Sequence, residues 1–414
     1  MSTSEWLFVP GGIRLAFWYT APGGVDAQGL GSALARMVRR HPLLGARIAQ
    51  SPGGGEFRPL GTEPLVAVRP AGTSLEEELT RASITAEPGL VHAAVLPGHP
   101  GDTLVVSLHH AIADGQSARA FATELAALRA AARATAPDAP RDTHSAPALP
   151  VPPPIEQLID RRPHPEDELA RYANRRHALA RSADVAQLPH RSGVGRAGFA
   201  VGSVVADQAS TAGLLNAARS LHVSLHALVC AAATIAVRRL SGHRSGQRVP
   251  SVCHMPVDMR RRLRIAPGTQ CFASSGHHAV LELTADADPL AAGQEISRQL
   301  AQAVLDGGLE REILALPRLV EAAPLPISIG VTELGTSRHP HRATAPPTGL
   351  PLVPAPVPLA ATSLAAGRLH IALPYFRQWY GDDLMRNLRE EIHDVLRAAA
   401  GTRRLHAPVG SSHP

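Results

Sequence analysis

The chain has 414 residues and a formal net charge of +6, and all the positive side chains in that sum are arginines because the sequence contains no lysine. The lack of lysine excludes Schiff-base catalysis and a P-loop nucleotide site. The arginines are spread along the chain and aromatic residues make up only 3% of it, so we do not expect nucleic-acid binding.

Cysteine use and hydropathy indicate the compartment. Cys230, Cys253 and Cys271 form no Cys-x-x-Cys pair, so neither a disulfide framework nor a zinc site is predicted, and a reducing cytoplasm fits. The N-terminus lacks the continuous apolar region of a signal peptide, and the longest apolar run, residues 225–237, is too short to cross a bilayer. We expect a soluble, cytoplasmic protein with room for two domains of about 200 residues each.

The first part of the chain alternates strand and helix patterns. Apolar runs predict strands at residues 15–19, 43–48, 65–68, 91–96 and 102–108. Apolar residues at three- and four-residue spacing predict helices over residues 26–40 and 75–84. His41-Pro42 ends the first helix, which gives His41 a structural role, and the Gly53-Gly54-Gly55 run predicts a hairpin turn.

A turn rich in ionisable residues follows the strand at residues 102–108. It runs from His109 to Gly115 with the sequence His-His-Ala-Ile-Ala-Asp-Gly, and a helix that Ser117 can cap comes next. Side chains on a turn between two rigid elements are fixed yet reachable, and a neutral imidazole accepts protons near pH 7. Three hypotheses fit these residues: polar groups that close a strand, a metal site that lacks an obvious third ligand, or a general base.

The second half of the chain begins near Ala197, after a proline-rich connection at residues 131–155 and a charged helix around residues 166–176. Strands are predicted at residues 199–205, 249–255, 326–332 and 369–373, and helices at residues 210–220, 224–240 and 382–401. Proline-dense residues 345–358 separate the last two strands. The strand at 249–255 leads into Pro-Val-Asp-Met-Arg, which ends at Arg260.

These motifs resemble those of a known superfamily. The His-His-x-x-x-Asp-Gly pattern after an apolar strand resembles the signature of the condensation-domain and chloramphenicol-acetyltransferase-like acyltransferases, in which the second histidine is catalytic. Residues 256–260 are similar to the Pro-Val-Asp-Leu-Arg element of the polyketide-associated acyltransferases, the phthiocerol dimycocerosyl transferase group, and His-Pro-Leu-Leu at residues 41–44 is also similar. Where many relatives have Asn-x-x-Gly, this chain has Gln-Cys-Phe-Ala at residues 270–273.

The resemblance implies both a fold and residue roles. The fold would be α/β, with two chloramphenicol-acetyltransferase-like subdomains at residues 1–180 and 196–414 that form a V-shaped pseudo-dimer with an active-site tunnel between them. His110 would be the general base. Asp114 would pair with Arg260 rather than orient His110.

The neighbouring residues of the motif have simpler expected roles. His109 would be bonded locally at the strand end. Gly115 would allow close backbone packing or a positive φ. Neither residue is expected to take part in the chemistry.

The implied activity is acyl transfer from a carrier-protein or coenzyme A thioester to a hydroxyl acceptor in polyketide, lipid or other natural-product biosynthesis. No cofactor would be permanently bound, since acyl-CoA or acyl-phosphopantetheine serves as co-substrate, and a monomer is expected. Two alternatives stay open: amide formation on an amine, and a carrier-binding module or repurposed cyclase that transfers nothing.

The densest positive run contains Arg261, Arg262 and Arg264, directly after the Pro-Val-Asp element. These arginines either form a solvated loop or meet the anionic donor, which is coenzyme A or an acidic carrier protein. Contacts of the second kind would steer the encounter and weaken as salt is added.

Overall fold

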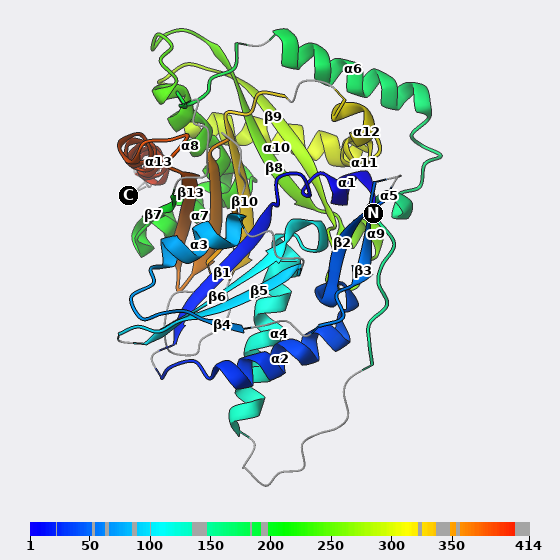
Figure 1. The fold of residues 1–414 in the computed structure, drawn as a ribbon. Coiled ribbons are helices and arrows are strands. Elements are labelled where there is room, and N and C mark those ends of the chain that lie inside the picture. Colours follow the sequence, from blue (N-terminus) through cyan, green and yellow to red (C-terminus); the bar gives the residue numbers. More distant parts are fainter. Residues whose placement is uncertain are drawn as a thin grey trace, which may run out of the picture.

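The computed structural model describes residues 1–21, 23–51, 54–62, 66–84, 89–99, 101–134, 147–182, 184–191, 198–321, 325–336, 348–352 and 357–401. Two mixed β-sheets lie side by side, each with its own helices (Figure 1). The predicted α/β class is therefore confirmed. In the described part of the chain, no single helix is long and apolar enough to cross a membrane; the bent pair at residues 208–221 and 225–240 passes by length and composition only.

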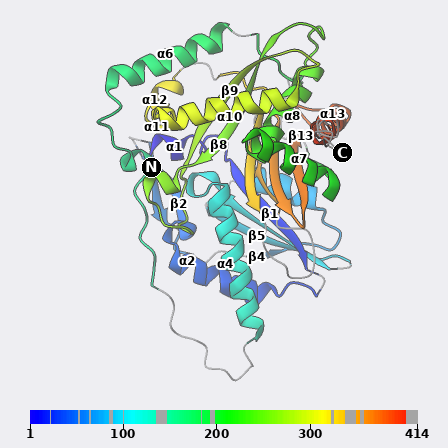
Figure 2. The same cartoon turned by 180° about the vertical axis from the view of Figure 1, so that it is seen from behind.

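The first sheet has five strands in the order β11-β1-β6-β5-β4. Their bounds are β1 (Arg14–Ala21), β4 (Val66–Val68), β5 (Val91–Leu96), β6 (Asp102–His109) and β11 (Thr348–Leu352). On one face, β1 and β6 bury alternate apolar side chains such as Phe17 and Val106 against Phe121 and Leu34, which come from α4 (Gly115–Ala134) and α2 (Ala27–Arg40). Figure 2 shows both helices from that side.

The opposite face of the first sheet is covered by α3 (Leu75–Ile84), where Leu79 packs on Ala16 and Val105. A separate hairpin pairs β2 (Ala46–Ser51) with β3 (Gly54–Pro59). A hairpin was predicted here, but Gly54 and Gly55 belong to β3 rather than to the turn, and Gly53 lies outside the described residues. His41 ends α2 and bonds through Nε2 to Glu124 of α4 at 2.9 Å, which confirms its structural role.

The second sheet has six strands in the order β7-β13-β12-β10-β8-β9. Their bounds are β7 (Phe199–Val205), β8 (Val249–Asp258), β9 (Ser274–Leu283), β10 (Ile329–Thr336), β12 (Leu359–Ala365) and β13 (Arg368–Phe376). One face packs against α7 (Gln208–Leu221), α8 (Leu225–Leu240), α10 (Pro289–Leu305) and α13 (Asp382–Gly401). The alanine-rich α8 lies at the centre of this core, because small side chains let neighbouring helices and strands approach closely.

Two segments cross the predicted division between residues 1–180 and 196–414. Strand β11 comes from the second half of the sequence but pairs with β1 of the first sheet, with Leu350 opposite Ala16. Helix α6 (Glu166–Ser182) comes from the first half, yet its Leu169 packs on Leu309 and Ile313 of α11 (Gly308–Leu314), beside α12 (Leu316–Leu319). The two halves therefore exchange structural elements.

Two predicted strands start in the wrong place. Residues 43–45 belong to the short 3₁₀ helix η1 (Pro42–Gly45), so strand β2 starts only at Ala46. Strand β10 starts at Ile329 rather than near residue 326. Proline explains the first shift, because it fixes φ and lacks the N–H that a strand would donate.

Several elements were not predicted. They include β9, β12 and α10, the 3₁₀ helix η2 (His110–Ile112), and β11, which forms inside the segment predicted to be a proline-dense connection. Within the predicted surface connection at residues 131–155, α4 continues to Ala134, residues 135–146 lie outside the described residues, and α5 spans Ile155–Leu158.

Candidate active site

The site is built on the turn between β6 and α4. Strand β6 ends at His109, η2 spans His110–Ile112, and α4 starts at Gly115. The Asp114 carboxylate accepts a hydrogen bond from the Ser117 N–H at 2.9 Å, which satisfies one of the free donors at the start of α4. The prediction that Ser117 caps this helix is therefore wrong; the cap is Asp114.

Asp114 and Arg260 form the predicted pair. Nη1 of Arg260, at the start of α9 (Arg260–Leu263), lies 2.7 Å from Oδ2 of Asp114, and both side chains are buried. The same carboxylate oxygen accepts the Ala273 N–H at 2.9 Å. Burial disfavours the charged guanidinium, but the nearby Asp114 carboxylate outweighs it, so the pKa of Arg260 is raised above its ordinary value. Arg260 therefore stays charged, and its contact with Asp114 joins the two halves.

Ser117 adds a second link across the same interface. Its hydroxyl donates to the Cys271 carbonyl at 2.7 Å and accepts from Nη2 of Arg260 at 2.7 Å. Arg260 donates to the Cys271 carbonyl as well, at 3.0 Å. Gln270, in the segment that departs from the Asn-x-x-Gly pattern, is buried and donates to the Ser117 carbonyl at 3.3 Å. The Gln-Cys-Phe-Ala segment therefore anchors the start of α4.

His110 lies beside this interface in an apolar environment. Its ring stacks on Phe8, with centroids 4.1 Å apart and planes 8° apart, and it contacts Phe272 at 5.7 Å. Burial disfavours the imidazolium more than Asp114 and the nearby backbone carbonyls favour it, so the pKa of His110 is lowered. Nδ1 is buried and has no hydrogen-bond partner among the described residues.

His109 has a different role from its neighbour. It is buried, and its Nδ1 accepts the Ala111 N–H at 3.2 Å, which confirms the predicted local bond. Burial, with smaller effects of Arg14 and His110, lowers the pKa of His109 to about 3. His109 is thus a neutral side chain that shapes the turn.

Gly115 does not use a positive φ, so that option is wrong. A Cβ at this position would lie 3.4 Å from Cδ2 of Leu334 on β10, which is ordinary contact with the second half. This contact leaves room for a Cβ, so it does not require glycine at this position.

The three arginines after Arg260 are all exposed. Arg262 pairs with Glu310, with Nη2 at 2.6 Å from Oε1, so part of its charge is already neutralised. Arg264 ends α9 in the left-handed conformation at φ 55°. These contacts do not test the prediction that the three arginines bind an anionic donor.

Among the described residues, no group of three or more His, Cys, Asp and Glu side chains could hold a metal ion.

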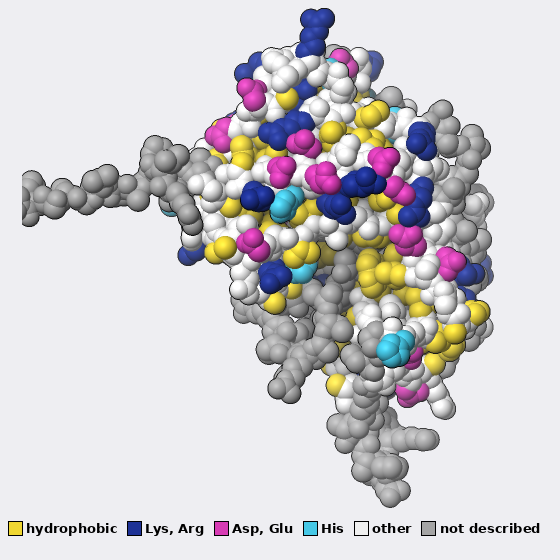
Figure 3. Space-filling view, turned by 90° about the vertical axis from the view of Figure 1, so that its left-hand side faces the viewer, with side chains coloured by type: hydrophobic (Ala, Val, Ile, Leu, Met, Phe, Trp, Pro, Cys, Tyr) yellow, Lys and Arg dark blue, Asp and Glu magenta, His cyan; other side chains and the backbone are white. Residues whose placement is uncertain are grey.

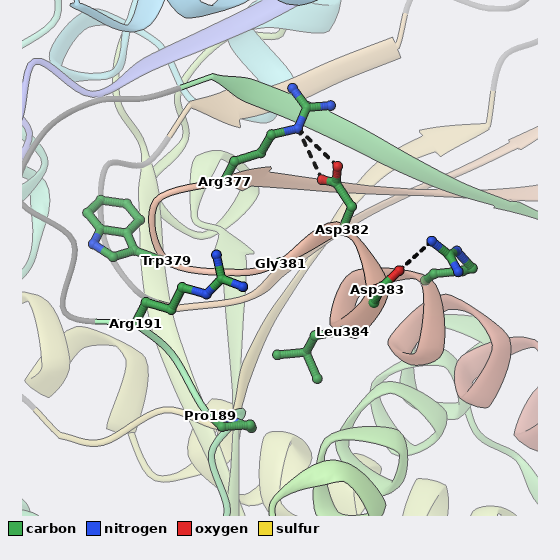
Figure 4. Close-up of a pocket in the computed structure, with 9 residues that line it drawn as sticks. Pro189, Arg191, Arg377, Trp379, Gly381, Asp382, Asp383 and Leu384 are labelled. Atoms are coloured by element: carbon green, nitrogen blue, oxygen red, sulfur yellow. Dashed lines mark hydrogen bonds and ion pairs between the residues drawn. The ribbon is translucent and has the colours of Figure 1, made fainter.

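A cavity of about 630 Å³ lies outside the His110 turn, at the start of α13. It is lined by Arg191, Trp379 and Arg377, among others (Figure 4). Arg377 pairs there with Asp382, and arginine and acidic side chains are intermixed over the face seen in Figure 3.

Comparison with known proteins identifies the fold. Residues 195–373 match the family model described as the phthiocerol/phthiodiolone dimycocerosyl transferase C-terminus. Among solved structures, polyketide synthase associated protein 5 from Mycobacterium tuberculosis is similar with a TM-score of 0.75 and 20% identity over 97% of this chain and 98% of that one. The chain has the fold of the condensation-domain and chloramphenicol-acetyltransferase-like superfamily. The resemblance predicted from the motifs is confirmed.

Two further structures extend the comparison. The trichothecene 15-O-acetyltransferase from Fusarium sporotrichioides has a TM-score of 0.74 and 12% identity over 96% of this chain and 94% of that one. The epimerization domain from the third module of tyrocidine synthetase B has a TM-score of 0.66 and 18% identity over 96% of each chain. Among curated proteins, none matches this chain in sequence.

The sequence could not reveal Phe8, Ser117 and Gln270 as parts of the site. Phe8 and Gln270 look like ordinary apolar and polar residues in short segments, and Ser117 looks like a helix cap. A usable signal was present for Gln270 only, because it stands at the position where the resemblance breaks down.

We expect Asp114→Asn and Arg260→Met each to lower the melting temperature, because each leaves a buried group uncompensated, at a cost of about 3 to 5 kcal/mol. The double variant should lose less than the sum of the two, since both changes remove the same interaction. Thermal unfolding of the four proteins measures the coupling.

Asp258→Asn is the matched control. Asp258 also contacts Arg260, at 2.9 Å, but its side chain is 42% exposed, so a much smaller loss is expected. Strict additivity of the Asp114 and Arg260 changes, or an equal loss in the control, would contradict the buried pair.

Proposed function

We propose that the protein is an acyltransferase that moves an acyl group from a carrier-protein or coenzyme A thioester to a hydroxyl acceptor, with His110 as the general base. The single observation that carries the proposal is the state of His110. Its ring is kept neutral by burial, and it lies on the turn that the Asp114–Arg260 pair holds against the second half.

A general base is the main catalytic group that this reaction requires. An alcohol attacks a thioester carbonyl only if its proton is removed as the C–O bond forms, and a neutral imidazole can take that proton. The tetrahedral oxyanion then collapses, the C–S bond breaks, and the departing thiolate takes the proton back from the imidazolium. No covalent enzyme intermediate is required.

The family match supports acyl transfer, and the similarity to an O-acetyltransferase fold favours a hydroxyl acceptor. The tunnel between the halves and the natural-product context are part of the same proposal. Intact-mass analysis of candidate alcohols and amines, incubated with several acyl thioesters, separates ester formation from amide formation and from a module that transfers nothing.

Replacing His110 by alanine should lower turnover about 10²- to 10⁴-fold, because the alcohol loses its proton acceptor. The melting temperature should change little by comparison. Steady-state kinetics with one thioester donor and one alcohol measures the effect.

His109→Ala serves as the matched control, since the His109 side chain accepts a hydrogen bond from the Ala111 N–H of its own turn. It should lower turnover less than the His110 change does. Wild-type turnover in folded His110→Ala protein would make the base assignment wrong.

The pH dependence should report the lowered pKa of His110. The base is active only when deprotonated, and an ordinary imidazole pKa lies near 6.5. Therefore kcat/KM should stay high below pH 6.5 and fall only as the pH passes through the lowered value. A profile measured with one donor tests this, and an acidic limb at or above pH 6.5 would contradict it.

Arg261 and Arg264 make no ion pair with other described residues, so we propose them as contacts for an anionic donor. Arg261→Glu with Arg264→Glu should raise KM for a carrier-bound donor and weaken its salt dependence, because surface charges act over about 8 to 10 Å. Kinetics at low and high salt measures both effects.

Arg262→Glu is the comparison variant, because Arg262 is already paired with Glu310. A short neutral thioester without a phosphate is the comparison donor, and its KM should hardly change. Equal kinetics of all variants with every donor would return these arginines to the solvated-loop interpretation.

A further inference from the structure

The aromatic rings of Phe8 and Phe272 both contact the imidazole of His110. Phe8 stacks on the imidazole at 4.1 Å with nearly parallel planes, and Phe272 contacts Phe8 at 5.0 Å and His110 at 5.7 Å, tilted by 56° and 60°. Phe8 comes from the N-terminal segment and Phe272 from the Gln-Cys-Phe-Ala segment of the second half. The general base is therefore held by side chains from both halves.

Phe8 is joined to His110 through the backbone as well as through its ring. The His110 N–H donates to the Ile13 carbonyl at 2.8 Å, and the Ile13 N–H donates to the Phe8 carbonyl at 3.0 Å. The stack of the two rings adds a third contact between this segment and His110. Gly12, at φ 56°, allows the tight reversal that brings Ile13 back to Phe8.

The N-terminal segment is itself anchored. The Met1 ammonium donates to the Gly55 carbonyl at 2.9 Å, the Ser4 N–H donates to Glu156 at 2.8 Å, and a capping box of Ser2 and Glu5 starts α1 (Thr3–Trp6). Phe8 thus projects from a fixed piece of backbone.

His110 lacks the usual means of orientation for a catalytic imidazole. In a serine-protease triad, an aspartate bonded to Nδ1 sets the ring plane and the tautomer. Here Oδ2 of Asp114 accepts from Arg260 and Ala273 and Oδ1 accepts from Ser117, while Nδ1 of His110 is buried without a partner among the described residues. No side-chain hydrogen bond of the described residues orients the ring, so its packing against Phe8 and Phe272 contributes to its orientation.

We propose that Phe8 is a positioning residue for His110: its stacked ring, held by Phe272 from the second half, fixes the imidazole plane so that Nε2 is presented to the acceptor hydroxyl. This inference rests on the proposed function, because it takes His110 to be the base. Parallel stacking restricts rotation about the Cβ–Cγ bond of His110, and a small misplacement of a base costs much of its effect.

The test replaces Phe8 by leucine, which keeps an apolar side chain but removes the stack. We expect kcat to fall about tenfold with KM nearly unchanged. The acidic limb of kcat/KM should move to higher pH, because water then reaches the imidazolium and the pKa of His110 rises toward its ordinary value. Modification of His110 by diethyl pyrocarbonate, located by peptide mass spectrometry, should become faster.

Two variants control for structural damage. Phe8→Tyr keeps the aromatic ring and should retain wild-type kcat, pH profile and modification rate. Leu7→Ala changes the neighbouring residue, which is 46% exposed, and should have no effect on any of the three.

The outcomes separate this inference from the proposed function. Wild-type values of kcat, acidic limb and modification rate in Phe8→Leu would overturn the positioning role and leave the base assignment intact. Equal losses in Phe8→Leu and Phe8→Tyr would also overturn it, because the ring would then serve only the fold. Wild-type turnover in His110→Ala would instead reject the proposed function, and this inference with it.

Discussion

The buried ion pair between Asp114 and Arg260 is the contact on which the site depends. An unpaired charge inside a protein is costly, so neither side chain tolerates loss of the other. Both are also fully engaged: the carboxylate accepts from Arg260, Ser117 and Ala273, and the guanidinium donates to Asp114, Asp258, Ser117 and the Cys271 carbonyl. The two halves therefore cannot slide against each other without breaking several charged hydrogen bonds, and the turn that carries His110 keeps its position.

The contact between Asp114 and Arg260 also limits which groups can hydrogen-bond to His110. Both oxygens of the carboxylate that caps α4 and pairs with Arg260 already accept hydrogen bonds, and none of these bonds comes from the imidazole four residues earlier. The rings of Phe8 and Phe272 pack against the histidine, and burial lowers its pKa. The surroundings of the His110 ring are therefore aromatic, where a catalytic triad would place an aspartate.

Local sequence patterns predicted α2 and α3, whose burial is one-sided, and β6, whose continuous apolar run is buried on both faces. They missed β12 and β9, whose alanine, serine and histidine residues lack the β-branched character of typical strands, and β11, which is a strand only because β1 offers an edge. In the site, the motif located His110, and the resemblance supplied the pairing of Asp114 with Arg260. The contact of Phe8 with His110 spans about a hundred residues of chain and leaves no sequence pattern.

The two adjacent histidines at the end of β6 differ in their hydrogen bonds, and this difference determines what each imidazole can do. The Nδ1 atom of His109 accepts a backbone N–H, so its proton lies on Nε2, and burial beside Arg14 keeps the ring neutral at every physiological pH. That bond shapes the turn. His110 starts η2, where its own N–H is taken by Ile13 and its ring is free of side-chain hydrogen bonds in the described structure. The proposed function gives the proton exchange with a substrate to His110, and this proposed division of roles agrees with the hydrogen bonds of the turn.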